Sequence, residues 1–387
     1  MTTITKTIPF AKPWITDDDR NAVMNVLRGD ILTHGPQNHA FEEEFAAFMG
    51  GEAYCVAVGS CMAALHLTYW QLGLGPGDEV IVPAQTHVAT AHAVEVVGAR
   101  AVFVDCESRT GNIDPARIEA KISPRTKAIS LVHFLGIPCD MDEILSLAER
   151  HNLKLVEDCA LAVGAHYNGR HVGLLGDAGC FSFYPVKHMT TGDGGMFVSR
   201  HRDLAEKVAK ARAFGVDKRF SERSIPGMYD APTLGVNYRM SDINAALGRQ
   251  QLARIDEILE RRRQNFKRLK TALGETDAFT ILDSAHPASQ NSHYCLSVVL
   301  RDEFIDRRNE IIMRLKEIGV GTSVYYPHPV PRMSYYQNKY GYEADDFKNA
   351  AAISDGSIAL PVGPHLTIDD IDYIAETVIQ TIRGYLS

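Results

Sequence analysis

The chain has 387 residues and a formal net charge of −8, with 45% hydrophobic and 23% charged residues. The composition is ordinary for a globular protein, and the length predicts a large domain with a smaller one. There is no basic excess to neutralise a phosphate backbone, so we expect no nucleic-acid partner.

The N-terminal segment and the cysteines indicate the compartment. The first residues, MTTITKTIPFAKPW, lack the apolar core of a signal peptide, and no stretch approaches the ~20 apolar residues of a membrane span. The seven cysteines are widely spaced and none forms a C-x-x-C pair, which argues against a disulfide framework or a zinc site. We therefore expect a cytoplasmic protein without a membrane partner and without a metal.

Short β-rich runs alternate with helical patterns between residues 40 and 200. Most of the runs are continuously apolar, as in strands buried on both faces of a parallel sheet. The predicted strands are Tyr54–Val58, Glu79–Val82, Ala101–Asp105, Ala128–His133, Lys154–Glu157, Cys180–Tyr184 and Met196–Ser199. The predicted helices among them include Met62–Leu72, Asp142–His151 and Leu204–Phe214. This repetition predicts an α/β layered domain with a mostly parallel sheet.

The pattern changes after about residue 240. Ser241–Leu269 reads as one long helix, followed by a strand at Tyr294–Leu300, a helix at Phe304–Ile318 and an extended piece at Gly321–Tyr326. A last helix begins near Thr367, where Asp370 three residues on completes a capping-box pattern. We predict a large domain with an N-terminal arm over residues 1–250 and a smaller α+β domain over residues 251–387.

Two of the predicted strands end in side chains suited to cofactor chemistry. Lys187 follows Phe181-Ser182-Phe183-Tyr184-Pro185-Val186, and a lysine just past a buried strand can have a lowered pKa and form a Schiff base with a carbonyl. Asp158 ends the strand Lys154-Leu155-Val156-Glu157, where a carboxylate could stabilise a protonated pyridine nitrogen. Position alone favours a surface lysine in a hairpin-like loop for Lys187, and a helix cap or a structural ion-pair member for Asp158.

Two further strand ends add weaker signals. Gly59-Ser60-Cys61 leads from a strand into the helix that begins near Met62, and such a helix start offers free amides and a positive dipole end to a phosphate. His87 follows the next strand and could stack its ring on a pyridine, although a lone histidine is more often structural or a general base. The glycine fingerprints of dinucleotide and NTP sites are absent, which disfavours a nicotinamide dehydrogenase.

In this order the features resemble the DegT/DnrJ/EryC1/StrS family of sugar aminotransferases, which have the fold-type-I architecture of pyridoxal-phosphate (PLP) enzymes. The similarity runs nearly end to end. The matching motifs are Gly35-Pro36 with Phe41–Phe45, Ala63–Leu67, Gly75–Pro83, Glu157-Asp158, Ser182-Phe183, Lys187, Gly192–Gly195, Gly235–Met240, Tyr326-Pro327 and Leu360-Pro361. The resemblance implies an α/β fold with a large domain around a mostly parallel seven-stranded sheet and a smaller α+β C-terminal domain.

The resemblance also implies a role for each site residue. Lys187 would hold the cofactor as a Schiff base and shuttle the proton between Cα and C4′, while Asp158 would pair with the pyridinium nitrogen. His87 would take the place of the stacking aromatic. The phosphate would be held by Ser182, by the amides around Ser60, Cys61 and Met62, and by Asn237 of the other subunit. Substrate contacts would come from Tyr238, Arg239, Tyr326 and His328.

Three positions depart from the family's usual pattern. Ser60-Cys61-Met62 stands where Ser-Gly-Thr is common, so a threonine hydroxyl is missing. Leu161 stands where glutamine or histidine often approaches the phenolic oxygen of the cofactor, and His87 replaces Phe, Tyr or Trp. All three departures suggest a sub-branch of the family with its own substrate.

The resemblance implies a homodimeric transaminase of amino-sugar or polysaccharide biosynthesis that works by ping-pong transfer. The donor would be L-glutamate and the acceptor a keto-sugar, expected to be nucleotide-linked. Alternatives are a smaller carbonyl acceptor such as a phosphorylated triose or a cyclitol, a PLP-dependent sugar dehydratase, and a non-catalytic regulatory relative. In the dehydratases a histidine replaces the lysine, whereas this chain has Lys187 followed by His188.

Overall fold

The computed structural model describes residues 6–217, 224–225, 227–301, 304–343 and 345–385. Its central feature is a seven-stranded sheet of order β1-β9-β8-β5-β4-β2-β3. The strands are β1 (Tyr54–Val58), β2 (Glu79–Pro83), β3 (Arg100–Val104), β4 (Thr126–Val132), β5 (Lys154–Asp158), β8 (Ala178–Ser182) and β9 (Gly195–Ser199). Only β9 runs antiparallel to its neighbours β1 and β8, and the other pairs are parallel. The predicted mostly parallel sheet is confirmed.

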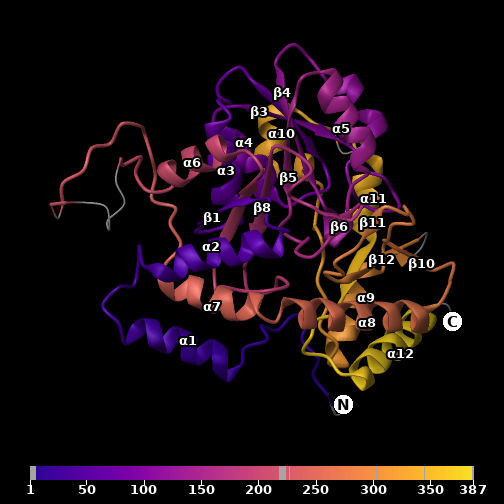
Figure 1. The fold of residues 1–387 in the computed structure, drawn as a ribbon. Helices are drawn as coiled ribbons and strands as arrows, with labels where there is room; N and C mark the ends of the chain where they lie inside the picture. Colours follow the sequence, from indigo (N-terminus) through magenta and orange to yellow (C-terminus); the bar gives the residue numbers. More distant parts are fainter. Residues whose placement is uncertain (1–5, 218–223, 226, 302–303, 344, 386–387) are drawn as a thin grey trace.

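Helices cover both faces of this sheet, which is why its strands are continuously apolar (Figure 1). One face packs on α3 (Cys61–Gln71), α4 (Val88–Val96) and α6 (Arg202–Ala211). The other packs on α2 (Pro36–Phe48), α5 (Met141–Arg150) and α7 (Asp242–Leu252), and α1 (Asp17–Leu27) lies outside α7. Because side chains alternate along a strand, Val56 and Val58 enter the first layer and Ala57 the second.

The C-terminal part forms a second, antiparallel sheet of order β10-β12-β13 with its own apolar core. Its strands are β10 (Phe279–Ile281), β12 (Leu296–Leu300) and β13 (Ser357–Leu360). Its helices are α8 (Ile255–Leu273), α9 (Arg308–Glu317) and α12 (Ile368–Arg383). Thr367 and Asp370 form the predicted capping box at the start of α12. The N-terminal arm crosses to this part, since Ile8 bonds Gly319 and lies in its core.

Other C-terminal segments return to the large sheet. The helices α10 (Ser334–Tyr340) and α11 (Lys348–Gly356) place Tyr336 and Ile353 in the same core as α3 and α4. A small sheet joins β11 (Ser289–Gln290) to β6 (His166–Tyr167) and β7 (Arg170–His171). The boundary at residue 250 therefore stays a prediction, although the two cores are distinct.

Three predicted elements differ from the structure. The single helix Ser241–Leu269 is wrong: α7 and α8 are separate because Arg254 leaves the helical conformation (φ −113°, ψ 13°), where its guanidinium bonds Asp19 at 2.7 Å. The extended piece Gly321–Tyr326 forms only an isolated bridge between Ser323 and Ala359. The α-helix predicted over Phe304–Ile318 is shorter and spans Arg308–Glu317.

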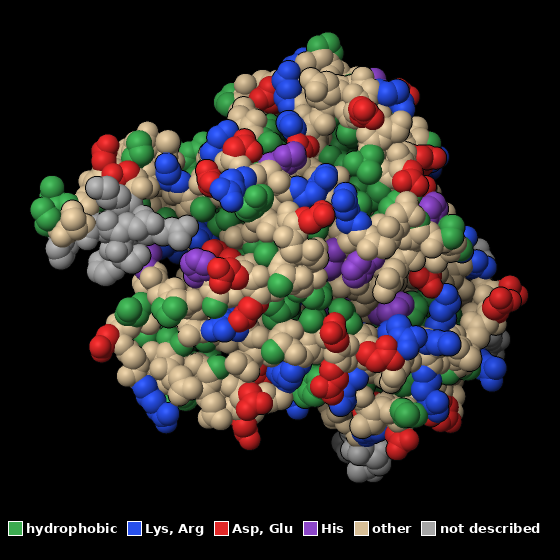
Figure 2. Space-filling view, in the orientation of Figure 1, with side chains coloured by type: hydrophobic (Ala, Val, Ile, Leu, Met, Phe, Trp, Pro, Cys, Tyr) green, Lys and Arg blue, Asp and Glu red, His purple; other side chains and the backbone are tan. Residues whose placement is uncertain are grey.

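The surface of the described residues carries mixed charge. Figure 2 shows acidic and basic side chains interspersed over the face in view. Within the part of the chain that the structure describes, no helix is long and apolar enough to cross a membrane.

Candidate active site

Four predicted site segments meet at one edge of the large sheet. β1, β2, β5 and β8 run in one direction, so their carboxyl ends share an edge (Figure 1). Ser60 follows β1, His87 follows β2, Asp158 ends β5, and Lys187 follows β8. Ligands of such sheets bind beyond the carboxyl ends of the strands.

The Lys187 amine lies in a desolvated position at this edge. Its Nζ is 5.4 Å from the centre of the Tyr294 ring. Burial lowers the pKa of Lys187, and the nearby acidic groups, the Cys61 thiol and the Asp158 carboxyl among them, oppose the lowering only in part. The neutral amine, which is the nucleophilic and basic form, is therefore more accessible than in a surface lysine.

Asp158 holds a carboxylate beside this amine without a cationic partner. The residue is 4% exposed. Its Oδ2 accepts a hydrogen bond of 2.7 Å from the Thr90 hydroxyl, and its Oδ1 accepts one of 3.0 Å from the Ala160 amide. Among the described residues no lysine or arginine forms an ion pair with it. A buried carboxylate held this way is suited to receive a cation from a ligand.

The start of α3 supplies free amides to the same edge. The Ser60 hydroxyl caps the helix by accepting from the Ala63 amide at 3.1 Å, so that hydroxyl is engaged locally. The Cys61 and Met62 amides precede the first intrahelical bond and remain available to an anion. The Cys61 side chain turns inward, where its thiol donates to the Cys180 carbonyl at 3.3 Å.

Gly195 on β9 allows the helix start to sit against the sheet. A Cβ there would lie 2.5 Å from the Ser60 carbonyl carbon and 2.6 Å from the Cys61 nitrogen. These atoms are backbone, so any larger residue would displace the start of α3. The last position of the motif Gly192–Gly195 is thus a glycine because a side chain there would clash with the backbone.

His87 and Ser182 flank the lysine and carboxylate. His87 caps α4 by accepting from the Ala89 amide at 3.2 Å, and its exposed ring meets the Tyr326 ring edge-on at 5.4 Å. Partial desolvation lowers the pKa of His87; the charge of Lys187 lowers it further and Asp158 raises it. Ser182 is buried at the end of β8, where its hydroxyl accepts from the Tyr184 amide at 3.4 Å.

The remaining predicted residues lie apart from this group within one chain. The Tyr238 carbonyl accepts from the Gly59 amide at 2.8 Å, but its hydroxyl pairs with the His66 ring at 3.1 Å. The Arg239 guanidinium lies over the Phe214 ring at 4.9 Å. Asn237 and His328 are exposed, and Asn237 forms an isolated bridge with Ala213. The structure therefore brings together the predicted residues at the strand ends, namely Lys187, Asp158, Ser60, Cys61, Met62, His87, Ser182 and Tyr326.

The sequence analysis missed three residues that contact this group. Thr90 bonds Asp158, and the only available signal was its place in the first turn of a helix that follows a strand end. Tyr294 lies under the Lys187 amine, and its hydroxyl pairs with that of Tyr325 at 2.6 Å. Both tyrosines come from the C-terminal part, so no local pattern could place them.

Leu161 and His188 are core residues. Leu161 is buried in the same apolar cluster as Phe134 and offers no polar side chain. His188 donates from Nε2 to the Ser292 carbonyl at 3.1 Å, and burial together with the nearby Arg262 charge holds its pKa well below the usual value. His188 is thus a neutral structural histidine, and the side chain at the site is that of Lys187.

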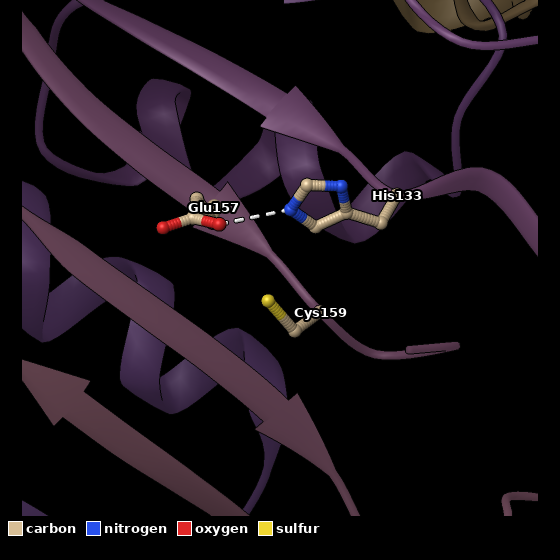
Figure 3. Close-up of side chains that lie close together, drawn as sticks. All are labelled: His133, Glu157 and Cys159. Carbon is tan, nitrogen blue, oxygen red and sulfur yellow. Dashed lines mark hydrogen bonds and ion pairs between the residues drawn. The ribbon is translucent and has the colours of Figure 1, made fainter. Parts of the chain in front are cut away.

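Glu157 lies on the opposite side of β5 from Asp158, next to His133 and Cys159 (Figure 3). One Glu157 oxygen accepts from His133 Nε2 at 2.9 Å and Gly173 N at 2.7 Å. The other accepts from Leu175 N at 2.8 Å and Gly176 N at 2.7 Å. His133 Nδ1 accepts from the Cys139 amide at 3.1 Å, so Nε2 carries a proton. With these atoms engaged, the cluster is a structural network and not a metal site.

The residues present fit a PLP molecule by the chemistry of their groups. The lysine amine with its lowered pKa matches the aldehyde, and the buried carboxylate matches the ring nitrogen. The free helix amides match the phosphate, and the exposed His87 ring matches the ring face.

Comparison with known proteins identifies the family. Residues 13–379 match the DegT/DnrJ/EryC1/StrS aminotransferase family. The chain is 38% identical over 384 residues to the spore coat polysaccharide biosynthesis protein SpsC of Bacillus subtilis, covering 97% of each chain. The PLP form of Spr1654 from Streptococcus pneumoniae superposes with a TM-score of 0.92 at 28% identity, covering 99% of this chain and 100% of that one.

The sugar aminotransferase CalS13 from Micromonospora echinospora superposes with a TM-score of 0.87 at 28% identity, covering 97% of this chain and 100% of that one. The predicted fold type and the predicted cofactor are thereby confirmed. The chain belongs to the DegT/DnrJ/EryC1/StrS family and is a PLP-dependent aminotransferase.

Proposed function

We propose that this enzyme moves an amino group from L-glutamate to a nucleotide-linked keto-sugar in two half-reactions. The observation that carries the proposal is the pairing of a desolvated Lys187 amine with a buried, cation-free Asp158 carboxylate at the carboxyl edge of the sheet. SpsC, by its name, acts in polysaccharide biosynthesis, and CalS13 is a sugar aminotransferase, which supports a sugar acceptor.

When bound, PLP supplies an electron sink for the charge that develops at the substrate carbon. We assign Asp158 to the ring nitrogen, where its negative charge keeps that nitrogen protonated. The hydrogen bonds from Thr90 and Ala160 fix the carboxylate, and no lysine or arginine in the described part of the chain forms an ion pair with it. Asp158 therefore maintains the sink and takes no part in proton transfer at the substrate.

Lys187 is the proposed acid–base group. Its amine takes a proton from the substrate Cα in its neutral form and returns it at C4′ as the ammonium. Desolvation lowers the pKa of Lys187, so the neutral form costs less free energy than it does in a surface lysine. The Tyr294 ring, 5.4 Å from Nζ, attracts the ammonium through its face and steadies the charged form.

The remaining groups are proposed to hold the cofactor and to orient the substrate. We assign the phosphate to the amides of Cys61 and Met62 with the Ser60 and Ser182 hydroxyls, and the stacking position to His87. The substrate residues are proposed to be Tyr326 and His328 together with Tyr238 and Arg239. Tyr326 has the best support, because its ring contacts His87.

We propose a homodimer in which Asn237 reaches the phosphate of the partner subunit. Asn237 is exposed and outside the Lys187 group of its own chain. Large apolar side chains are exposed near it, on α1 and just after α1, where they are available to a subunit interface. These residues are Met24, Leu27, Ile31, Phe214 and Leu234. The described residues between α6 and α7 also extend away from the sheet, at the left of Figure 1.

The cytoplasm is the proposed location. All seven cysteines are free thiols. Free thiols are typical of a reducing compartment.

The test uses visible absorption and product analysis of the PLP-loaded protein. Wild type is expected to show a yellow band that moves to the near ultraviolet when L-glutamate is added. Lys187→Ala is expected to lose this change and turnover. Lys207→Ala, an exposed lysine on α6, is the matched control and should behave like wild type.

Acceptors are then screened among UDP-, GDP- and dTDP-linked 4-keto and 3-keto hexoses. An amino-sugar product supports the proposal, whereas a deoxy-sugar would indicate dehydration instead. A small triose or cyclitol as the sole acceptor would overturn the nucleotide-sugar assignment. Full turnover by Lys187→Ala would overturn the assignment of the lysine.

A further inference from the structure

Arg262 is a buried cation on α8 that the proposed chemistry does not use. The residue is 5% exposed, and burial lowers the pKa of its guanidinium to about 10. In the part of the chain that the structure describes, no carboxylate forms an ion pair with it. A buried charge without a counter-charge costs free energy, and an apolar side chain of similar volume would often be more stable. Stability alone therefore does not explain an arginine at this position.

The hydrogen bonds of Arg262 go to the backbone of two residues of the candidate site. Its Nη1 donates to the Tyr294 carbonyl at 2.8 Å, and its Nη2 makes a longer contact with the Lys187 carbonyl at 3.5 Å. The planar guanidinium carries its donors in a fixed fork, so one side chain can hold two carbonyls at a set spacing. Its Nε has no acceptor among the described residues. The guanidinium is thus oriented towards the two carbonyls even though one of its own donors stays unsatisfied.

The two carbonyls belong to segments that are far apart in the sequence. Lys187 lies in the loop after β8, whereas Tyr294 lies just before β12 of the C-terminal sheet. The next residue, His188, joins the same two segments a second time, because its Nε2 donates to the Ser292 carbonyl at 3.1 Å. Arg262 reaches both segments from α8, so its side chain ties the lysine loop to the C-terminal part.

This tie fixes the place of the Lys187 amine relative to the Tyr294 ring. The amine nitrogen lies 5.4 Å from the centre of that ring, and the guanidinium carbon of Arg262 lies 6.0 Å from the same centre. The cavity that these three residues line has a volume of about 10 Å³, so their side chains are closely packed. A shift of the Lys187 backbone would move the amine away from the ring and out of its desolvated position.

We propose that Arg262 is a positioning residue, which holds the backbone of Lys187 and Tyr294 so that the Lys187 amine keeps its place in the active site. Arg262 acts through the two carbonyls and not by contact with the reacting atoms. A displacement of about 1 Å in an active site can lower the rate about a hundredfold. The inference rests on the proposed role of Lys187 and goes beyond it by naming the side chain that aligns the amine.

The pKa of Lys187 is sensitive to this alignment. Burial lowers it, and the nearby acidic groups raise it by a smaller amount. The titratable groups around the amine come from several elements, namely Cys61 of α3, Asp158 of β5, His87 before α4, His188 of the lysine loop and Cys295 before β12. If the loop is released, water reaches the amine and the pKa of Lys187 rises towards its ordinary value.

The first test compares the half-reaction with L-glutamate in the full-length, PLP-loaded variants. Arg262→Met removes the donors and should lower kcat by about ten- to a hundredfold, with KM changed by less than about twofold. Arg262→Lys keeps the charge without the fork and should recover part of this loss. Arg263→Met is the matched control, because Arg263 is an exposed neighbour on α8 that pairs with Glu260, and it should behave like wild type.

The second test follows Lys187 without turnover. Cofactor-free protein is mixed with PLP, and the rate at which the yellow band appears is measured between about pH 6 and 10. Because the neutral amine is the nucleophile, the midpoint of this pH profile reports the pKa of Lys187. The midpoint should move to higher pH in Arg262→Met and stay at the wild-type value in Arg263→Met.

The two tests together separate positioning from a merely structural role. A lower kcat together with a shifted midpoint in Arg262→Met would support the proposal, and the absence of either would overturn it. If neither Arg262→Met nor Arg262→Lys folded, Arg262 would be a structural residue and the proposal would be withdrawn. Full turnover by Lys187→Ala would instead overturn the proposed function, whereas wild-type behaviour of the Arg262 variants alone would overturn only this inference.

Discussion

The substitution Glu157→Gln separates the two adjacent acids of β5. The carboxylate of Glu157 accepts four hydrogen bonds and is fully buried. Glutamine has the same size but replaces one oxygen by an NH₂ group, which cannot accept. In either orientation of the glutamine amide, its NH₂ group faces two of the four hydrogen-bond donors. His133 cannot relieve the conflict by moving its proton, since its Nδ1 already accepts from Cys139.

The expected loss follows from counting unsatisfied donors. A buried donor left without an acceptor costs about 1–3 kcal/mol, so two cost about 2–6 kcal/mol of unfolding free energy. Relief of the buried charge offsets a part of this. The substitution should nevertheless leave the chemistry at Asp158 intact, because Glu157 points to the other face of the strand.

The assay is denaturant unfolding of the cofactor-free proteins at one protein concentration, because dimerisation and ligand both shift the apparent midpoint. Glu157→Gln should show a clearly lower midpoint, while Glu149→Gln, an exposed glutamate on α5, should match wild type. If Glu157→Gln had the same midpoint as wild type, the four hydrogen bonds would contribute nothing to the free energy of unfolding. Glu157 would then not be the stabilising residue that we infer.

Two further predictions concern the walls of the site, and a third concerns a buried histidine on the other face of the sheet. Gly195→Ala should weaken PLP binding at least about tenfold in equilibrium titration, because the added carbon meets the backbone at Ser60. Thr90→Val should lower kcat by roughly tenfold with little change in KM, because Asp158 loses its 2.7 Å donor. Burial lowers the pKa of His171 to about 3. Below about pH 6.5 the ring of His171 is therefore protonated in the unfolded chain but stays neutral in the folded chain. The free energy of unfolding falls as the pH drops towards 3. His171→Asn should flatten that slope by up to about 1.4 kcal/mol per pH unit in acid unfolding series.

The strands of the large sheet could be predicted because each is a continuous apolar run with a turn after it. All seven predicted runs correspond to strands, with ends displaced by no more than a few residues. The single helix over Ser241–Leu269 failed for a different reason. The break falls at Arg254, whose guanidinium contacts Asp19 more than 200 residues away, and the local sequence carries no proline or glycine to mark it.

In the candidate site, too, some residues could be predicted from the local sequence and others could not. Lys187 and Asp158 could be placed because Asp158 ends β5 and Lys187 lies in the loop that follows β8, and parallel strands bring their ends together. Tyr294 could not, since it reaches the amine through the packing of the C-terminal part against the lysine loop. The role predicted for Asn237 depends on a second subunit, and the substrate contacts predicted for Tyr238 and Arg239 stay predictions.

The pair Glu157-Asp158 shows why a motif alone could not assign these acids. Successive side chains of a strand point to opposite faces, so the two carboxylates enter different environments. Glu157 meets three amides and a histidine of its own fold, which saturate it. Asp158 meets a hydroxyl, one amide and the Cys61 thiol on the side of α3 and α4, which orient it, and no described lysine or arginine forms an ion pair with it. A saturated acid can only stabilise the fold, whereas an oriented acid with uncompensated charge can serve a ligand. That difference follows from β5 ending at Asp158 and not at Glu157, so a one-residue shift of this strand would exchange the two roles.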